Sequence, residues 1–374
     1  MKFARFVMRL LVTLPVWAQS PAVGSYKQGM AHAEQGNYDQ AIQDFNESIR
    51  LNSKNPGAFF QRGRAYHEKG DRDRAIQDYT EAIRLRPNDP DTFFYRGNAY
   101  LEKSDFDRAL PDFAEAIRID PKHAASFTSR GEVYQRKGDY ERAFREFDAA
   151  IRIDRNWYAA LLGRGILYNG KGDYDHAIQD LTSVIKANPG IAEAFQARGV
   201  AYNLKDDYSR ALLDFNEAIR LKPDYEFAFI ARGMMRLYSG RLPEAQRDFS
   251  RAVQVKPLNA RGVIWLYIAR VKAGNDAQDE LKQNSARLIQ FATWPAPLVQ
   301  LYLGQATPEQ VERAAGDDPE RKCEAKFYAG EHSLLNSNRA EAAGLFRSAL
   351  EICRKDLPEY APALAELRDL DKPK

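Results

Sequence analysis

The chain has 374 residues, with 55 lysines and arginines, 52 aspartates and glutamates, and a formal net charge of +3. Because charges of both signs are mixed along the sequence, we expect no basic surface that binds nucleic acid or an anionic membrane. Beyond the extreme N-terminus no apolar run reaches the about 20 residues that span a bilayer. We therefore expect a water-soluble protein without a transmembrane segment.

Residues 1–20 differ from the rest of the chain. Basic residues come first, an apolar stretch covers residues 10–17, and small residues follow from Ala18. This pattern is typical of a secretory signal peptide with cleavage near Ala18, and it predicts a periplasmic or secreted protein. The alternative is a cytoplasmic protein that retains an amphipathic N-terminus. No cysteine lies near the boundary, so we expect no lipid anchor there.

From residue 22 to residue 259 the sequence repeats with a period of 34 residues. Six units share an Arg-Gly pair, at Arg62-Gly63, Arg96-Gly97, Arg130-Gly131, Arg164-Gly165, Arg198-Gly199 and Arg232-Gly233. Sixteen positions after each glycine stands a large apolar residue: Tyr79, Phe113, Phe147, Leu181, Phe215 or Phe249. A leading unit, residues 22–55, keeps Gly29 and Phe45 at the same places. Seven stacked units predict an all-α solenoid of antiparallel helix pairs.

Each residue type of the repeat has a physical role. Glycine and alanine let the two helices of a pair approach closely, and the large side chains fill the space between them. Turns such as Gly70-Asp71 end one helix and cap the next; Ser104 and Asp206 stand where other units have the turn glycine. The pattern resembles the tetratricopeptide repeat, which implies a superhelical array that binds other proteins.

After residue 259 the period decays, and we expect a degenerate repeat and an atypical helical cap over residues 260–374. An exposed solenoid end has to be covered, so atypical terminal units are typical of such arrays. The helices that we expect here cover residues 264–269, 277–290, 298–303 and 308–315, a repeat-like hairpin over 323–353, and a last helix over 359–370.

The two cysteines, Cys323 and Cys353, are expected to open the first helix of this hairpin and to close the second. These ends are neighbours in an antiparallel pair, so the positions predict a disulfide, which would contribute roughly 3–4 kcal/mol in the chain-entropy model. Such a bond persists in an oxidising compartment, in agreement with the export signal. The alternative is two buried thiols in a cytosolic protein.

Short segments of the C-terminal part suggest a narrower family. Residues 265–269, 301–304 and 327–330 resemble the end of the NlpI-type lipoproteins, bacterial envelope proteins built of tetratricopeptide repeats. The resemblance implies a homodimeric adaptor that presents cell-wall hydrolases to a periplasmic protease and scaffolds peptidoglycan machinery. The chain lacks the lipobox cysteine of that family, so a soluble periplasmic form is implied.

The sequence contains no catalytic motif. The five histidines have no metal-ligand spacing, Cys323 lacks a nucleophile signature, and the glycines follow the repeat rather than a phosphate loop. We therefore expect no catalytic residue, no metal and no cofactor, in a protein that is not an enzyme.

Each repeat arginine has an acidic counterpart on the second helix. These acids are Asp78, Asp112, Glu146, Asp180, Asp214 and Asp248. Because they follow the strict period, we interpret them as bridges within each helix pair rather than as a recognition ladder.

A second stripe on the first helices is predicted to line the concave groove. Its members are Phe60, Arg64, Phe94, Asn98, Leu162, Val200, Asn203, Ile230 and Met234. Exposed apolar side chains beside arginine and asparagine suit an extended peptide or a partner helix. The alternative is that some of them complete the packing between repeats.

These observations favour an exported, non-catalytic adaptor of the bacterial envelope whose partners are other proteins or peptides. Two alternatives stay open. One is a structural assembly factor of an outer-membrane or secretion complex, and the other is a cytosolic regulatory repeat protein.

Overall fold

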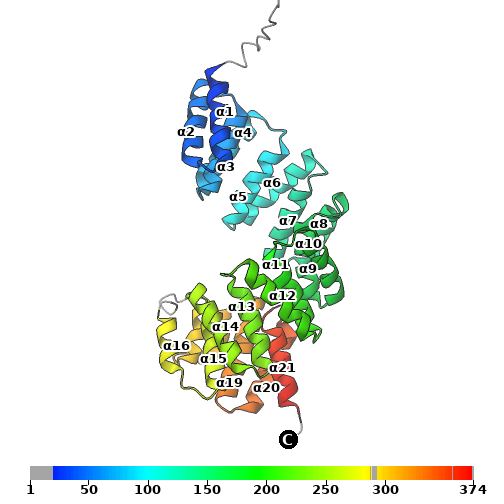
Figure 1. The fold of residues 1–374 in the computed structure, drawn as a ribbon, viewed down its shortest axis with the longest axis vertical. Coiled ribbons are helices and arrows are strands. Elements are labelled where there is room, and N and C mark those ends of the chain that lie inside the picture. Colours follow the sequence, from blue (N-terminus) through cyan, green and yellow to red (C-terminus); the bar gives the residue numbers. More distant parts are fainter. Residues whose placement is uncertain (1–19, 287, 289–292, 356, 373–374) are drawn as a thin grey trace, which may run out of the picture. The chain divides into compact units, whose positions relative to one another are not determined.

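The computed structural model describes residues 20–286, 288, 293–355 and 357–372. Throughout these ranges the chain consists of helices joined by turns and short connections, and successive helices form pairs (Figure 1). The predicted all-α repeat solenoid is confirmed. The predicted signal segment lies outside the described residues, apart from Ser20.

The chain forms two compact units, Met1–Arg155 and Asn156–Lys374. The described part of the first unit contains α1 (Pro21–Glu34), α2 (Tyr38–Leu51), α3 (Pro56–Glu68), α4 (Arg72–Leu85), α5 (Pro90–Glu102), α6 (Phe106–Ile119), α7 (Ala124–Arg136) and α8 (Tyr140–Ile153). Each odd-numbered helix packs on the next even-numbered one, and α2, α4 and α6 also contact the following pair.

The second unit continues the same pairing and ends in the C-terminal cap. Its described part contains α9 (Tyr158–Lys171), α10 (Tyr174–Ala187), α11 (Ala192–Leu204), α12 (Tyr208–Leu221), α13 (Glu226–Tyr238), α14 (Leu242–Val255), α15 (Ala260–Lys272), α16 (Gln278–Ser285), α17 (Ala296–Tyr302), α18 (Pro308–Ala315), α19 (Pro319–Leu335), α20 (Arg339–Ile352) and α21 (Tyr360–Leu370). The repeat bounds and the boundary near residue 260 stay predictions.

In most pairs the two helices are joined by a turn in which a residue with positive φ is followed by a capping residue. Gly70 has the left-handed φ of +83° that glycine adopts without a steric cost. The next residue, Asp71, caps α4 by accepting a hydrogen bond from the backbone N–H of Arg74 at 3.1 Å. The same cap recurs at Asp105, Asp139, Asp173 and Asp207. Local residues therefore set where each helix ends and the next begins.

The repeat glycine lies directly against the large side chain of the second helix. A Cβ on Gly97 would lie 2.8 Å from Cε1 of Phe113, a ring that is fully buried. In the C-terminal hairpin a Cβ on Gly330 would lie 2.7 Å from Cε1 of Phe346. A larger residue at either glycine would have to push the two helices apart.

Trp265 of α15 joins the repeat array to the C-terminal cap within the second unit. The indole is fully buried, stacks on Phe249 of α14 with 5.8 Å between ring centroids, and contacts Phe327 of α19 at 5.6 Å. These contacts extend one hydrophobic core from the last repeat into the hairpin.

The predicted disulfide between Cys323 and Cys353 is present and joins α19 to the end of α20. Cys323 does not open α19 as we expected, because the helix begins one turn earlier, at Pro319. Asp318 caps this earlier start by accepting hydrogen bonds from the N–H groups of the next turn. The helix expected over 277–290 is shorter, since α16 ends at Ser285; residues 287, 289 and 290 lie outside the described residues.

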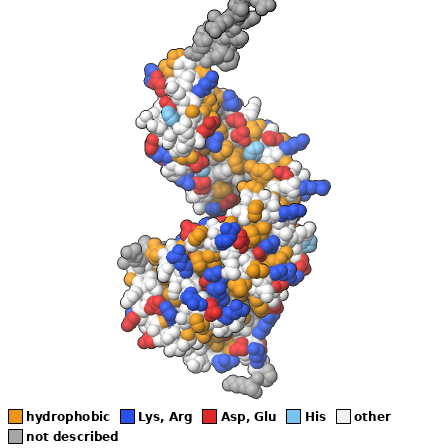
Figure 2. Space-filling view, in the orientation of Figure 1, with side chains coloured by type: hydrophobic (Ala, Val, Ile, Leu, Met, Phe, Trp, Pro, Cys, Tyr) orange, Lys and Arg blue, Asp and Glu red, His pale blue; other side chains and the backbone are white. Residues whose placement is uncertain are grey.

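On the face seen in Figure 2, acidic and basic side chains are interspersed in the described part of each unit. This agrees with the mixed charges of the sequence.

A glycine pair in the C-terminal hairpin tests the packing. Gly330→Ala should lower the free energy of unfolding by about 1–3 kcal/mol, because its Cβ would overlap the ring of Phe346. Gly344→Ala in α20 is the matched control, because its Cβ meets nothing within 4 Å. This variant should raise the free energy of unfolding by about 0.5–1 kcal/mol. Urea unfolding followed by circular dichroism measures both. Equal effects of the same sign would contradict the close approach at Gly330.

Candidate functional site

Four of the predicted groove residues lie in the first unit, Phe60 and Arg64 on α3 and Phe94 and Asn98 on α5. The two rings are half-buried and pack toward the next repeat. The ring centroids of Phe60 and Tyr95 lie 5.3 Å apart, and those of Phe94 and His123 lie 5.2 Å apart. Arg64 is exposed, and its guanidinium lies 5.3 Å from the centre of the Tyr95 ring. This stripe therefore combines packing between repeats with an exposed cation.

The other five predicted groove residues lie in the second unit, Leu162 on α9, Val200 and Asn203 on α11, and Ile230 and Met234 on α13. We expected all of them to be exposed. None of them is: Leu162, Val200 and Asn203 are half-buried, and Ile230 and Met234 are buried, with exposed fractions of 4% and 7%. The reason is tertiary: α21 contacts α13 and covers this part of its surface.

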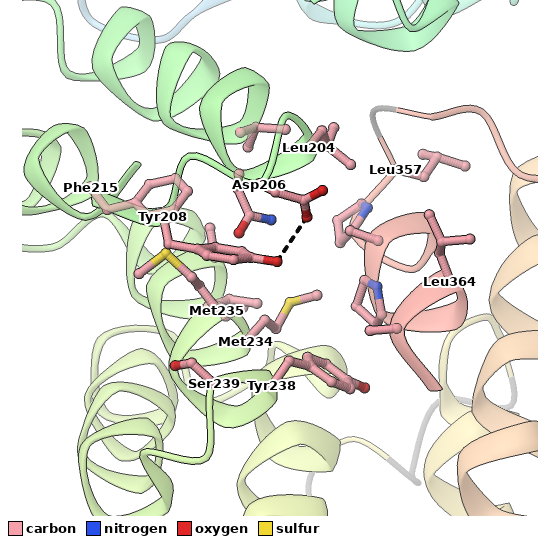
Figure 3. Close-up of a pocket in the computed structure, with 18 of the residues that line it drawn as sticks. Leu204, Asp206, Tyr208, Phe215, Met234, Met235, Tyr238, Ser239, Leu357 and Leu364 are labelled. Atoms are coloured by element: carbon pink, nitrogen blue, oxygen red, sulfur yellow. Dashed lines mark hydrogen bonds between the residues drawn. The ribbon is translucent and has the colours of Figure 1, made fainter. Parts of the chain in front are cut away.

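A pocket of about 260 Å³ lies between α11–α13 and the C-terminal segment of the second unit (Figure 3). Four predicted groove residues line it: Val200, Asn203, Ile230 and Met234. Leu357 and Leu364 form the wall on the side of α21 (Figure 3). Leu162 does not line the pocket.

The C-terminal wall of the pocket is what the sequence prediction missed. The signal that could have pointed to it is the helical spacing of its lining residues, Leu357, Ala361, Leu364, Ala365 and Arg368. This spacing predicts an apolar helix face, but it does not say which other helix that face contacts.

Asp206 and Tyr208 form a polar edge of the pocket. The Tyr208 hydroxyl donates a hydrogen bond to Asp206 Oδ1 at 2.8 Å (Figure 3), and this bond raises the pKa of the hydroxyl. Asp206 has a φ of +59°, at the turn position where most repeats place glycine. A residue with a Cβ is strained in this conformation, and such strain is often found at functional sites.

Between α20 and α21 the described residues 353–355 and 357–359, here called the strap, carry Leu357 to the pocket wall. It begins at Cys353, which the disulfide holds to α19. The backbone N–H of Lys355 donates a hydrogen bond to the carbonyl of Gly170 at 3.4 Å, and the Lys355 side chain lies against Gly172 at the end of α9. Both attachments precede Leu357 in the chain and hold the start of the strap.

A buried ionic cluster holds α21 to α15 and α19. Lys272 Nζ of α15 lies 3.2 Å from Glu331 Oε2 of α19 and also pairs with Glu366 of α21. The Tyr238 hydroxyl donates to Glu331 Oε1 at 2.9 Å. Burial, together with the negative charge of Glu366, raises the pKa of Glu331 to about 7, although Lys272 and the hydroxyl oppose the shift.

A second cluster of the same kind surrounds Arg261 of α15. Its guanidinium pairs with Glu324 of α19, and its Nε lies 3.5 Å from Oε1 of Glu359, the residue before α21. Tyr328 donates its hydroxyl to Glu359 Oε1 at 3.4 Å. Burial raises the pKa of Glu359 to about 7, with Glu324 adding to the shift and Arg261 opposing it. Each cluster thus sets two carboxyl groups around one cation.

The periodic arginines pair with their carboxylates inside each helix pair, as we interpreted. Arg62 donates two hydrogen bonds to Asp78, from Nε at 2.8 Å and from Nη2 at 2.6 Å. The other pairs are Arg96–Asp112, Arg130–Glu146, Arg164–Asp180, Arg198–Asp214 and Arg232–Asp248. The acids are buried or nearly so, and burial raises the pKa of Asp78 and Asp112 despite the arginine. Their role is structural.

Among the described residues, no three His, Cys, Asp or Glu side chains converge in a way that could hold a metal ion. Within the same part of the chain, no helix has the length and apolar character needed to cross a membrane.

Comparison with known families agrees with the helix pairing. A family model described as "TPR repeat" matches residues 29–70 and 63–104, and one described as "Tetratricopeptide repeat" matches residues 96–160 and 162–226. The chain is a tetratricopeptide-repeat protein. Proteins of this family are in general protein-binding scaffolds, and neither match indicates an enzyme family.

Solved structures share the tetratricopeptide-repeat fold. A tetratricopeptide-repeat protein from Parabacteroides merdae is 19% identical, with a TM-score of 0.55 over 67% of this chain and 98% of that one. The structure described as a functional characterization of Pseudomonas aeruginosa PilF is 16% identical, with a TM-score of 0.50 over 56% of this chain and 95% of that one. At these identities the likeness shows the fold alone. No curated protein matches the chain.

The ionic clusters of this tetratricopeptide-repeat protein predict a pH dependence of stability. The folded pKa of Glu331, about 7, lies above its ordinary value of 4.5. Its stabilising contribution is therefore complete below about pH 4.5 and is lost as the pH rises to about 7, a loss on the order of 1–3 kcal/mol. Urea unfolding from pH 4.5 to pH 8 measures it.

Glu331→Gln is the control for this pH dependence, because an amide of nearly the same shape does not titrate. The difference in unfolding free energy between the wild type and this variant should shift in favour of the variant as the pH rises. A difference that stays constant from pH 4.5 to pH 8 would contradict the raised pKa.

The two non-glycine turns of the tetratricopeptide repeats form a matched pair. Ser104→Gly should raise the free energy of unfolding by about 0.5–1 kcal/mol, because Ser104 has a φ of +58°. Asp206→Gly relieves the same strain but removes the acceptor of the Tyr208 hydroxyl. It should therefore raise the free energy of unfolding by less than Ser104→Gly does. In a Tyr208→Phe background, Asp206→Gly should recover the full gain. Thermal and urea unfolding test this, and a loss of stability in both glycine variants contradicts it.

Proposed function

We propose that this protein is a non-catalytic adaptor of the bacterial periplasm that holds client proteins near one another. Its clients would be cell-wall hydrolases and a processing protease, as the resemblance of the C-terminal segments to NlpI-type proteins implies. The same resemblance favours a homodimer. The adaptor would act by geometry alone, because two proteins bound to one scaffold meet at a high effective concentration.

The observation that carries this proposal is the stripe of groove residues on the first helices of a tetratricopeptide-repeat array. In the first unit it presents the exposed Arg64 beside the half-buried Phe60 and Phe94, a combination that suits a peptide with acidic and apolar side chains. In the second unit, four residues of the stripe line a pocket.

The compartment is proposed from two independent features. The first 20 residues have the composition of a secretory signal peptide. The cap contains a disulfide between Cys323 and Cys353, and such bonds persist in oxidising compartments such as the periplasm.

Cross-linked affinity capture from intact cell envelopes tests the function. Wild-type protein should enrich a periplasmic protease or peptidoglycan hydrolases. Arg64→Glu should reduce this enrichment about threefold or more, because a charge at the edge of an interface governs steering and register. We choose Arg64 because its side chain is exposed and is not one of the rings that pack on Phe60 and Phe94.

Arg86→Glu is the matched control, since Arg86 is exposed at the end of α4 and lies outside the stripe. Equal capture by the Arg64 and Arg86 variants would remove the stripe of the first unit from the binding site. Capture of cytosolic partners alone, with residues 1–20 still present by N-terminal sequencing, would overturn the periplasmic adaptor and favour a cytosolic regulatory protein. Clients that co-purify in fixed stoichiometry would favour a structural part of a larger complex.

A further inference from the structure

The pocket of the second unit is closed by the protein's own C-terminal segment. Met234 of α13 lies on one side, and Leu357 and Leu364 lie on the other (Figure 3). Ile230 of α13 also lines the pocket. Its volume of about 260 Å³ lies just below the range of about 300–1,000 Å³ typical of sites for whole small molecules. A space of this size and apolar character fits a single large side chain.

The edge of the pocket exposes aromatic rings. Tyr208 and Phe227 both line it, yet their exposed fractions are 49% and 45%. They belong to the few large hydrophobic side chains that are exposed in the described part of the chain. Exposed aromatic rings around a desolvated pocket are typical of the sites where a partner inserts an anchoring side chain.

Polar groups at the pocket are suited to a peptide. Gln196 and Asn203 of α11 line it, and their side-chain amides can pair with the N–H and C=O groups of an extended backbone. An acyl chain would leave both amides without a partner. A peptide is therefore the occupant that these side chains favour.

Charged side chains of both signs lie at the pocket. Asp206 already accepts the Tyr208 hydroxyl, and Arg261 is paired with buried carboxyl groups. Arg368 of α21 also lines the pocket, is exposed, and has no ion pair with another described residue. The opening thus carries the negative charge of Asp206 and the positive charge of Arg368, and Arg368 complements a carboxylate on the ligand.

We propose that this pocket binds a peptide of a partner protein by taking one bulky apolar side chain between α13 and α21, while Arg368 pairs with an adjacent carboxylate of the same peptide. The site is composite, because the strap and α21 supply the wall that encloses the side chain. This inference rests on the proposed function, since it names the kind of segment that a client presents.

Selection of random ten-residue peptides displayed on phage against the full, disulfide-bonded chain tests the proposal. The enriched peptides should share a Phe, Leu, Ile or Met within two positions of an Asp, a Glu or a free C-terminal carboxylate. Their affinities are then measured by fluorescence polarisation with the wild type and with variants.

Two variants test the two parts of the site without disturbing the fold. Ala365→Leu enlarges a side chain that lines the pocket and fills the space from α21, so it should weaken binding about tenfold or more, the value of one buried side chain. Arg368→Glu should weaken binding about threefold to tenfold. A peptide whose acidic residue is replaced by Lys should bind Arg368→Glu better than it binds the wild type.

Arg251→Glu is the matched control for the charge change, because Arg251 is exposed on α14 and bonds only to Gln254 among the described residues. Circular dichroism and urea unfolding confirm that each variant is folded. Binding that is unaffected by Ala365→Leu and by Arg368→Glu overturns the proposal, as does the absence of any selected peptide. Direct binding of laurate that Ala365→Leu abolishes, with no peptide selected, would assign the pocket to an acyl chain instead.

This experiment separates the pocket from the proposed function. If Arg64→Glu abolishes client capture while Ala365→Leu and Arg368→Glu leave both capture and peptide binding intact, the adaptor stands and the pocket inference fails. If the selected peptides depend on the pocket but no envelope client is captured, the pocket stands and the periplasmic adaptor fails.

Discussion

The close approach of two helices at the repeat glycine is the contact on which the rest of the structure depends. At Gly97 the ring of Phe113 occupies the space that a Cβ would need, and at Gly330 the ring of Phe346 does the same. Because one contact sets the distance within each pair, successive pairs of a unit share a geometry, and within each unit their first helices present equivalent positions along one face. The buried bridge from Arg62 to Asp78, and its repeats, satisfies the charged groups beside this contact.

In the second unit, the C-terminal segment covers part of the face that the first helices form. Without α21, Ile230 and Met234 would be part of an open apolar stripe; with it they line a pocket. The attachment of α21 is not electrically neutral, since Lys272 and Arg261 each face two carboxyl groups. Burial of excess negative charge makes this attachment depend on protonation, whereas the apolar contacts and the disulfide do not.

Next to the pocket, the residue at the turn position differs from the glycine of most repeats. Asp206 takes a backbone conformation that suits glycine, and its carboxylate accepts the Tyr208 hydroxyl at the pocket edge. Ser104 takes the same conformation in the first unit, so the strain by itself does not mark a site. A strained residue whose side chain also contributes to a cavity is more informative, because the energetic cost is then accompanied by a contact that glycine could not make.

The sequence by itself determined the helix pairs, the Arg–carboxylate bridges and the partner of Cys323, because each depends on contacts within one pair and the 34-residue period repeats those contacts. It also predicted the bounds of α18, and those of α17 and α21 to within two residues. Thr307 caps α18, and prolines stand near the starts of all three helices. Only the tertiary structure decided that α21 lies against α13, that Glu331 and Glu359 are buried, and that four stripe residues meet in one pocket. A helical spacing shows that a helix has an apolar face, but the choice of the surface that covers this face depends on shape and on desolvation of charges between segments far apart in the chain.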